Sequence, residues 1–218
     1  MTGPFVIPAS TARALREAPA DRATVLLLRH SARGPLPPDA PGNEVPLLPE
    51  GTALAGALGL QVGPRLRTLH TSPVRRCVET AVALAAGAGV ARRPVEDRLL
   101  GDPGVYVTEG AAAWRTWLAL GHAEVMARLV AGDRLDGLAD PIAASRALVR
   151  HLLGTAGGEP GVHVFITHDS IVATAAAHCL GLLLPPTEWP WYLESLVFWA
   201  GDAGVTARYR EWSGPVPW

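Results

Sequence analysis

The feature that most constrains this chain is a short apolar run, Val25 to Leu28, that leads directly into Arg29 and His30. The segment ends at Arg33, which is followed by a glycine and a proline-rich loop. A short apolar run bounded by turn signals is typical of a buried strand in a parallel sheet. Ligands of open α/β sheets bind just outside the carboxyl ends of such strands. The sequence therefore predicts an imidazole between two guanidinium groups at the place where such folds carry out their chemistry.

Arginine suits this place because its planar guanidinium recognises phosphate through two parallel hydrogen bonds. A histidine between two arginines is then a candidate nucleophile for attack on phosphorus. A histidine after a strand can equally be structural, and arginines there are commonly surface residues. This segment alone leaves both interpretations open.

The composition describes a globular chain of ordinary size. Its 218 residues are 49% hydrophobic and 18% charged, which indicates a sizeable core and one domain over 1–218. The net charge of -1, from 19 basic and 20 acidic residues, gives no reason to expect a nucleic-acid partner. Every basic residue is arginine, so a lysine Schiff base and a P-loop lysine are excluded.

Nothing in the sequence points to a membrane. No apolar run approaches the roughly 18–20 residues that span a bilayer, and residues 1–10 lack the charged and apolar regions of a signal peptide. Cys77 and Cys179 fall in segments expected to be helical and show no metal-binding or redox spacing. We expect a cytoplasmic protein with two buried, inert thiols and no membrane partner.

Strand-like and helix-like segments alternate along the chain. We expect parallel strands at 24–28, 66–69, 90–95 and 162–167, antiparallel closing strands at 192–199 and 204–210, and helices at 9–20, 50–60, 73–86, 111–131, 141–153 and 171–180. The segments 34–49 and 97–110 are rich in turn residues. This order predicts an α/β fold with a mainly parallel sheet.

Polar residues follow three of these strands. They are Arg29, His30 and Arg33 after the first, Thr71, Ser72, Pro73, Arg76 and Thr80 after the second, and His168 and Asp169 after the strand at 162–167. Each junction alone is weak, because Ser-Pro before a helix and an acidic residue at a helix start are ordinary capping and dipole features. Together they bring two histidines, three arginines and a carboxylate to one edge of the sheet, which a structural role hardly explains.

In these motifs the chain resembles the histidine phosphatase superfamily, which has the phosphoglycerate-mutase-like fold. That family pairs an Arg-His motif with a Ser-Pro…Arg…Thr-Ala segment and a second histidine, and all three occur here in family order. The Arg-His-x-x-Arg and His-Asp patterns resemble the acid-phosphatase-like branch, whereas the compact length and the Thr-Ser-Pro segment are closer to the mutase-like branch. The resemblance implies a three-layer α/β sandwich with helices on both faces of the sheet, working without metal or cofactor.

The resemblance also implies roles for individual residues. His30 would be the nucleophile and form a phosphohistidine, while Arg29, Arg33, Arg76 and His168 would bind the phosphoryl oxygens. Physical chemistry agrees, since a neutral imidazole is the attacking form and positioned positive charge stabilises the transition state.

Three neighbouring positions add to the expected site. Ser31 stands where the family most often has glycine, and a small residue still fits there beside the substrate. His70 ends its strand and either lines the pocket or is structural. Helical spacing to Thr80 favours Arg76 over Arg75 as the inward arginine. The remaining histidines have no motif context and are interpreted as structural: His122, His151, His163 and His178.

The proton donor is the least settled role. Asp169 matches the branch whose general acid follows the second histidine. A helix N-terminus lowers the pKa of a carboxyl group, which disfavours an acid, whereas an incoming phosphate dianion would raise it. Glu96, Asp102 and Glu109 lie where mutase-like members place a glutamate donor, and Asp102 is the second candidate. Asp169 as a plain helix cap remains the structural alternative.

Tryptophans give the remaining clue. Trp114 and Trp117 lie one helical turn apart in the segment where relatives vary their substrate cap, and Trp189, Trp191 and Trp199 cluster late in the chain. Such pairs are commonly core residues. If they line the pocket, the leaving group would have apolar or ring character.

We therefore expect a metal-independent phosphomonoester hydrolase that acts on a small phosphorylated metabolite; a homodimer is compatible with the sequence. Three alternatives stay open: a phosphomutase, a non-catalytic phospholigand-binding relative, and a metal hydrolase that uses His30, His70, His168 and Asp169.

Overall fold

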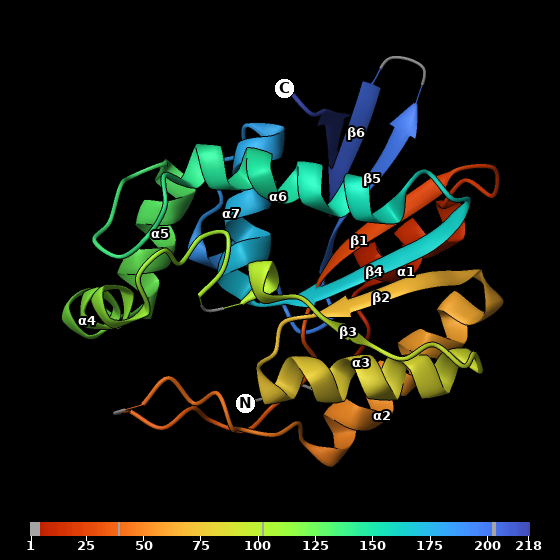
Figure 1. Ribbon diagram of the computed structural model, residues 1–218, viewed down its shortest axis with the longest axis horizontal. Coiled ribbons are helices and arrows are strands. Elements are labelled where there is room, and N and C mark those ends of the chain that lie inside the picture. The colour runs from red at the N-terminus through yellow and green to blue at the C-terminus, as the bar shows by residue number, and fades with distance from the viewer. Residues whose placement is uncertain (1–4, 39, 102, 202–203) are drawn as a thin grey trace.

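The computed structural model describes residues 5–38, 40–101, 103–201 and 204–218. In this part of the chain a seven-stranded sheet forms the centre of the molecule (Figure 1). Its strands are β1 (Ala23–Arg29), β2 (Leu66–Thr71), β3 (Val95–Glu96), β4 (Gly161–Thr167), β5 (Ser195–Gly201), β6 (Gly204–Tyr209) and β7 (Trp212–Pro215). The strand order is β3-β2-β4-β1-β5-β6-β7. The first four pair in parallel, and β5, β6 and β7 are added antiparallel beside β1.

Helices cover both faces of this sheet. They are α1 (Ala9–Glu17), α2 (Pro49–Val62), α3 (Arg75–Ala88), α4 (Gly110–Leu120), α5 (His122–Ala131), α6 (Pro141–Ala156) and α7 (Asp169–Leu180). Helices α1, α2 and α3 pack on one face, and α6 and α7 pack on the other. Helices α4 and α5 lie together at one end of the molecule, and the loop between β1 and α2 extends toward the same end (Figure 1). The α/β three-layer sandwich expected from the sequence is confirmed.

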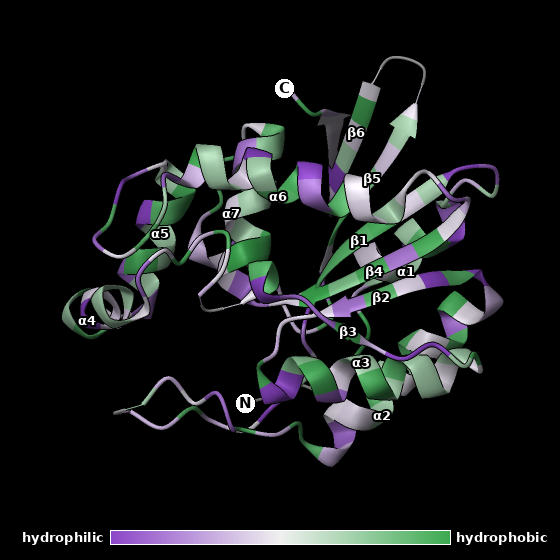
Figure 2. Cartoon of the chain, in the orientation of Figure 1, coloured by the Kyte–Doolittle hydropathy of each residue, from purple (hydrophilic) through white to green (hydrophobic). Residues whose placement is uncertain are grey.

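The apolar run of β1 is explained by burial on both sides of the sheet. Val25 and Leu27 belong to the core beneath α6 and α7, whereas Leu26 and Leu28 belong to the core beneath α2 and α3. All four side chains are fully buried. Since successive strand residues point to opposite faces, a strand between two helical layers needs apolar residues at every position. Figure 2 shows this as nearly continuous hydrophobic colouring along β1.

Three segments differ from the sequence expectation. The predicted helix 111–131 is broken at Gly121, whose φ of 79° belongs to the left-handed region that glycine adopts without strain, so α4 and α5 are separate helices. The predicted strand 90–95 is reduced to the two residues of β3, both exposed at the sheet edge. The first helix ends at Glu17, ahead of Pro19.

Helix α3 is held by unusually close contact with α2. A Cβ atom on Gly87 would lie 2.0 Å from the carbonyl oxygen of Gly56, and one on Gly59 would lie 2.1 Å from that of Leu84. Only glycine allows the two backbones to approach so closely. This packing fixes how α3 lies against α2, and the N-terminus of α3 points toward the carboxyl end of the sheet.

The two thiols behave as expected. Cys77 and Cys179 are free and buried, and burial raises the pKa of each to about 12, so neither is a thiolate at neutral pH. In the part of the chain that the structure describes, no helix is long and apolar enough to cross a membrane.

Candidate active site

A cavity of about 520 Å³ opens at the carboxyl end of the parallel strands. Five residues form what we call its polar end: His30, Arg33, Arg76, His168 and Asp169. They come from three separate junctions, namely the loop after β1, the start of α3 and the start of α7. The sequence motifs at these junctions are therefore brought together, as expected for ligand sites of open α/β sheets.

His30 is positioned by backbone contacts and is almost completely buried. Its N–H donates to the carbonyl of Thr167 on the neighbouring strand, at 2.9 Å. Its Nδ1 lies 2.8 Å from the carbonyl oxygen of Ser31. Because a carbonyl can only accept, Nδ1 carries the proton and Nε2 keeps a free lone pair. Burial, and then the nearby charges of Arg29, His168 and Arg76, hold the pKa of His30 well below its usual value, so the ring is neutral.

Arg76 connects the two imidazoles of the site. Its Nε lies 3.2 Å from Nε2 of His30, and its Nη2 lies 3.3 Å from Nδ1 of His168. A guanidinium only donates, so Nδ1 of His168 accepts and its Nε2–H donates to the Ser72 hydroxyl at 3.1 Å. Burial and the charge of Arg76 lower the pKa of His168 to about 3. Both imidazoles are thus neutral acceptors toward Arg76.

The two consecutive arginines of α3 point in different directions. Arg76 is buried and its Nη1 donates to the carbonyl of Gly42 at 2.9 Å, whereas Arg75 is exposed and forms an ion pair with Glu79 at 2.7 Å. The inward orientation expected for Arg76 is confirmed. Arg33 also lines the cavity, and its Nε is buried without a hydrogen-bond partner. Burial lowers the pKa of Arg33 and Arg76, yet a guanidinium stays charged at neutral pH.

Arg29 lies behind the polar end and contacts it through Asp169. Its Nη2 is 3.0 Å from Oδ2 of Asp169, its Nη1 donates to the carbonyl of Pro190 at 2.6 Å, and its guanidinium carbon lies 4.4 Å from the ring centroid of Tyr192. Burial raises the pKa of Asp169, but Arg29 and His122 outweigh it and hold the pKa well below its usual range. Asp169 is therefore an ionised carboxylate here. Arg29 itself is not among the residues that line the cavity.

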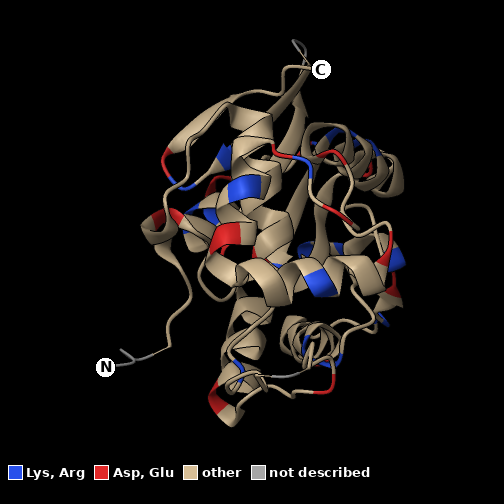
Figure 3. Cartoon of the chain, turned by 90° about the vertical axis from the view of Figure 1, so that its left-hand side faces the viewer, with Lys and Arg blue, Asp and Glu red and all other residues tan. Residues whose placement is uncertain are grey.

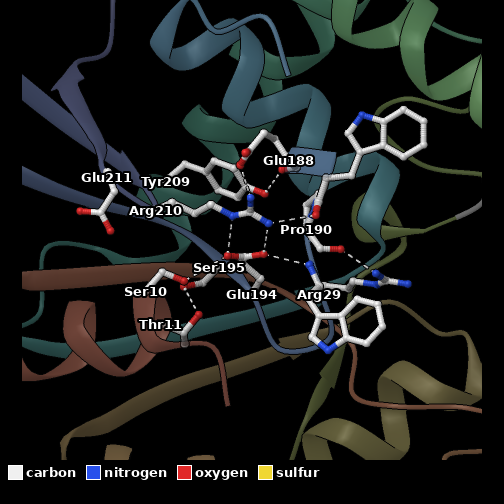
Figure 4. Close-up of polar contacts among 12 residues, drawn as sticks. Ser10, Thr11, Arg29, Glu188, Pro190, Glu194, Ser195, Tyr209, Arg210 and Glu211 are labelled. Atoms are coloured by element: carbon white, nitrogen blue, oxygen red, sulfur yellow. Dashed lines mark hydrogen bonds and ion pairs between the residues drawn. The ribbon is translucent and has the colours of Figure 1, made fainter. Parts of the chain in front are cut away.

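A buried ion pair supports Arg29 from the other side (Figure 4). The Arg29 N–H donates to the carbonyl of Glu194 at 3.0 Å. The carboxylate of Glu194 accepts two bonds from Arg210, both at 2.8 Å, and one from the N–H of Trp191 at 2.9 Å. Arg210 also pairs with Glu188. Neither Glu194 nor Arg210 is part of a motif recognised in the sequence, because their contacts depend on β6 lying against the 186–195 segment.

His122 belongs to the cavity, contrary to its interpretation as a structural residue. Its Nε2 lies 3.8 Å from Oδ2 of Asp169, and its Nδ1 accepts from the indole N–H of Trp117 at 3.3 Å. Its sequence context does not reveal this position when 111–131 is predicted to be one helix. The helix breaks at Gly121, and His122 becomes the first residue of α5. Gly121 is therefore the sequence signal that could have indicated a special position for His122. His151, His163 and His178 instead bond Asp97, Thr68 and the Leu129 carbonyl, respectively.

Two expected site residues lie away from the cavity lining. His70 stacks on Phe165, its register partner in β4, with 4.9 Å between ring centroids. The Ser31 hydroxyl donates to the carbonyl of Gly51 at 2.7 Å, and the Ser31 N–H donates to Thr80 at 3.0 Å. The expectation that their side chains bind substrate is therefore corrected, since strand pairing and helix packing engage them. Without His70 the four-residue metal alternative is not assembled, and in the described residues no group of three or more His, Cys, Asp and Glu is placed to hold a metal.

Of the three proton-donor candidates that the structure describes, Asp169 alone lines the cavity. Glu96 is exposed in β3, and Glu109 caps α4 by accepting from the N–H groups of Ala111 and Ala112. Neither lines the cavity. Asp102 lies outside the described residues.

Beyond the polar end, the cavity is lined mostly by apolar residues, which we call the apolar wall. They are Leu36, Pro37, Pro38, Ala40 and Pro41 from the loop after β1, and Tyr106, Val107, Ala113, Trp114, Trp117, Leu118, Leu129 and Leu138 from α4, α5 and their flanking loops. Trp114 and Trp117 thus line the cavity. Trp189 is not among the lining residues, and its ring lies edge-on to His122 with 6.2 Å between centroids. Trp199 of β5 contacts Arg208 of β6, away from the cavity.

No protein-family model and no curated protein matches this sequence. Solved structures do. A mutant of phosphoserine phosphatase from Entamoeba histolytica in complex with phosphoserine is 15% identical, with a TM-score of 0.61 over 87% of this chain and 97% of that one. A mycobacterial glucosyl-3-phosphoglycerate phosphatase is 20% identical, with a TM-score of 0.57 over 88% and 98%. Phosphoglycerate mutase from Bacillus anthracis is 15% identical, with a TM-score of 0.54 over 87% and 93%. At these identities the likeness shows the architecture, and the chain has the phosphoglycerate-mutase-like fold.

Proposed function

We propose that this protein is a histidine phosphatase, which hydrolyses phosphate monoesters through a phosphohistidine on His30 and needs no metal. The observation that carries the proposal is the state of His30: a neutral ring with an unprotonated Nε2, facing Arg76 in a cavity open to a ligand. That solved phosphatases and a mutase share the fold supports it.

In the first step, Nε2 of His30 attacks phosphorus while the bond from phosphorus to the ester oxygen breaks. Arg76 leaves its contact with Nε2 and donates to the phosphoryl oxygens, joined by Arg33 and by the Nε2–H of His168. The buried, unpartnered Nε of Arg33 is a donor that a phosphoryl oxygen would satisfy. Positive charge around the equatorial oxygens is what stabilises this transition state.

Asp169 supplies the proton that the departing alkoxide needs. In the ligand-free site its pKa is low because Arg29 and His122 outweigh burial. A phosphate dianion at the polar end competes for these positive charges and adds a negative one, which raises the pKa of Asp169. The carboxyl group can then hold a proton, transfer it to the ester oxygen and return to the carboxylate form.

In the second step, a water molecule attacks the phosphohistidine. Asp169, now a carboxylate, takes the proton of the water as the phosphorus–nitrogen bond breaks. The products are inorganic phosphate and a free His30, so atoms and charge balance over the cycle. The same residue serves as acid and then as base.

The test is to trap the phosphoenzyme. Rapid quenching after mixing with a ³²P-labelled alkyl phosphate should give a protein-bound phosphoryl group that is stable in alkali and lost in acid, as expected for phosphohistidine. His30→Asn should give none and should lose at least about 10³-fold in kcat. If His30→Asn turns over as fast as the parent protein, the proposal is wrong. Label that passes to an added alcohol rather than to water would indicate a mutase.

A further inference from the structure

The apolar wall is formed by two segments far apart in sequence that lie at the same end of the sheet. One is the proline-rich loop 34–43, of which the structure describes 34–38 and 40–43, and the other is the 106–138 region that contains α4 and α5. Figure 1 shows this loop and α4 extending to the same end of the molecule. Both segments lie outside the sheet and each contacts the polar end, through the carbonyl of Gly42, which accepts from Arg76, and through His122, which lies against Asp169.

Apolar side chains in this wall remain accessible and are gathered around one concave surface. Leu118 is 57% exposed and Leu36 is 39% exposed. Concave apolar surface beside a few convergent polar groups is the ordinary form of a small-molecule site. The 520 Å³ of the cavity exceeds what a phosphoryl group fills. The remaining space is therefore available to the alcohol part of an ester.

Among the described lining residues, charge is confined to the phosphoryl side of the cavity. Of the described lining residues, those with ionisable side chains other than the tyrosine are the polar end and His122, which contacts Asp169. Arg115 of α4 is exposed beside Glu109 and does not line the cavity. Figure 3, which views the α4 end, shows basic and acidic residues interspersed rather than gathered in one patch. A carboxylate or ammonium on the alcohol would lose water here and find no counter-charge among the described residues of the apolar wall.

The wall is tied to the polar end rather than loosely attached. The indole N–H of Trp117 donates to His122, and His122 lies against Asp169. An alcohol that packs on the tryptophans therefore sits next to the group that would protonate its oxygen. Contact with the wall can align the ester oxygen with Asp169.

We propose that the substrates are phosphate monoesters of uncharged, apolar alcohols, whose ring or hydrocarbon chain occupies the space between loop 34–43 and α4. This inference rests on the proposed function, and it adds the class of leaving group. Trp114, Trp117 and Leu118 are then specificity-determining residues, because they contact the alcohol and not the phosphoryl group.

The test compares primary alkyl phosphates whose leaving oxygens are chemically alike. Ethyl, hexyl, 2-phenylethyl and 2-(1-naphthyl)ethyl phosphate vary the apolar part, and phosphoserine and phosphoethanolamine carry charges. We expect kcat/KM to rise about 10- to 100-fold from ethyl to the two aromatic esters, mainly through KM. The charged esters should be no better than ethyl phosphate. A flat series, or a preference for the charged esters, would overturn the proposal.

Variants link this preference to the wall. Trp114→Ala should lower kcat/KM for 2-phenylethyl phosphate about tenfold more than for ethyl phosphate. Leu118→Ser should change the same ratio in the same direction by a smaller factor. Leu60→Ser is the matched control, because Leu60 is 73% exposed on α2 and outside the cavity. An unchanged ratio in Trp114→Ala would count against the wall as the binding surface.

The two proposals can fail separately. A trapped phosphoenzyme together with a flat ester series would retain the phosphatase and reject the apolar leaving group. If no ester is turned over, binding of the non-hydrolysable 2-phenylethylphosphonate and ethylphosphonate, followed by tryptophan fluorescence, still decides the second proposal. About tenfold tighter binding of the aromatic phosphonate supports it, and equal binding rejects it.

Discussion

The polar end and the apolar wall of the cavity are built in different ways. The polar end consists of residues from the loops and helix starts that follow strands: His30 and His168 come directly after β1 and β4, and the His30 N–H donates across the sheet to Thr167. The wall consists of a loop and two helices attached at the rim. The difference teaches that the chemical groups are fixed by the sheet itself, whereas the contacts that would select an alcohol are carried by segments that can vary without disturbing the sheet.

Among the variants that compare the two regions, substitution of Asp169 has the largest expected effect. It tests whether this residue of the polar end protonates the alcohol that packs on the apolar wall. Asp169→Asn removes the proton donor, so kcat/KM for 2-phenylethyl phosphate, which reports the first step, should fall by about 10²–10⁴. The fall should be much smaller for 4-nitrophenyl phosphate, whose leaving group needs no proton. Steady-state kinetics on both esters measure this. Equal losses on the two would reduce Asp169 to the helix cap that was the structural alternative.

Arg76 tests whether the polar end acts on every ester alike. Arg76→Gln removes the guanidinium that joins the two imidazoles, and we expect kcat/KM to fall by about 10²–10³ for apolar and small esters equally. Arg75→Gln is the matched control, since Arg75 is exposed and pairs only with groups outside the cavity, and it should change kcat/KM less than twofold. A loss in Arg76→Gln that depended on the alcohol would break the separation between the two regions.

Glu194 tests the support behind the polar end. Glu194→Gln removes the buried carboxylate and leaves Glu188 as the charged partner of the partly buried Arg210, and we expect about 2 kcal/mol less stability in urea unfolding. Glu17→Gln is the control, because Glu17 is exposed and pairs with Arg208 on β6, the strand that precedes Arg210. It should lower the free energy of unfolding by at most about 1 kcal/mol. Similar losses in the two variants would show that the buried pair contributes nothing special.

The smallest expected effect concerns proton binding to His30 and His168, which should not occur near neutral pH. Burial and Arg76 lower the pKa of His168 to about 3, and burial followed by Arg29 lowers that of His30. Neither ring should bind a proton between pH 8 and pH 5, as measured from imidazole ¹⁵N resonances assigned with His30→Asn and His168→Asn. An unfolded histidine binds its proton near pH 6.5. Because the folded protein keeps His30 and His168 unprotonated, the free energy of unfolding should fall as pH falls from 6.5 toward 3. A midpoint near 6.5 for either would contradict this.

The sequence allowed the fold and the polar end to be predicted because their signals are local. The apolar run before Arg29, the Ser-Pro start of α3 and His168 at the end of β4 each mark a strand end, and parallel strands bring such ends together. The residues that were missed depend on tertiary contact. His122 enters the cavity only through the break at Gly121, and Glu194 meets Arg210 only after β5 and β6 have paired. His70 and Ser31 were placed at the site by their neighbours in sequence, while packing had engaged their side chains elsewhere.

The Arg29–Asp169 ion pair also bears on how the protein would release its product. The carboxylate is paired with a cation that would otherwise attract phosphate, so it acts as an internal competitor of inorganic phosphate. Each turnover would end as Asp169 returns to Arg29 and displaces the anion. Asp169→Asn lacks this competitor. It should therefore bind inorganic phosphate more tightly than the parent protein, as measured by calorimetry. A variant that hydrolyses alkyl esters slowly would then also release its product slowly.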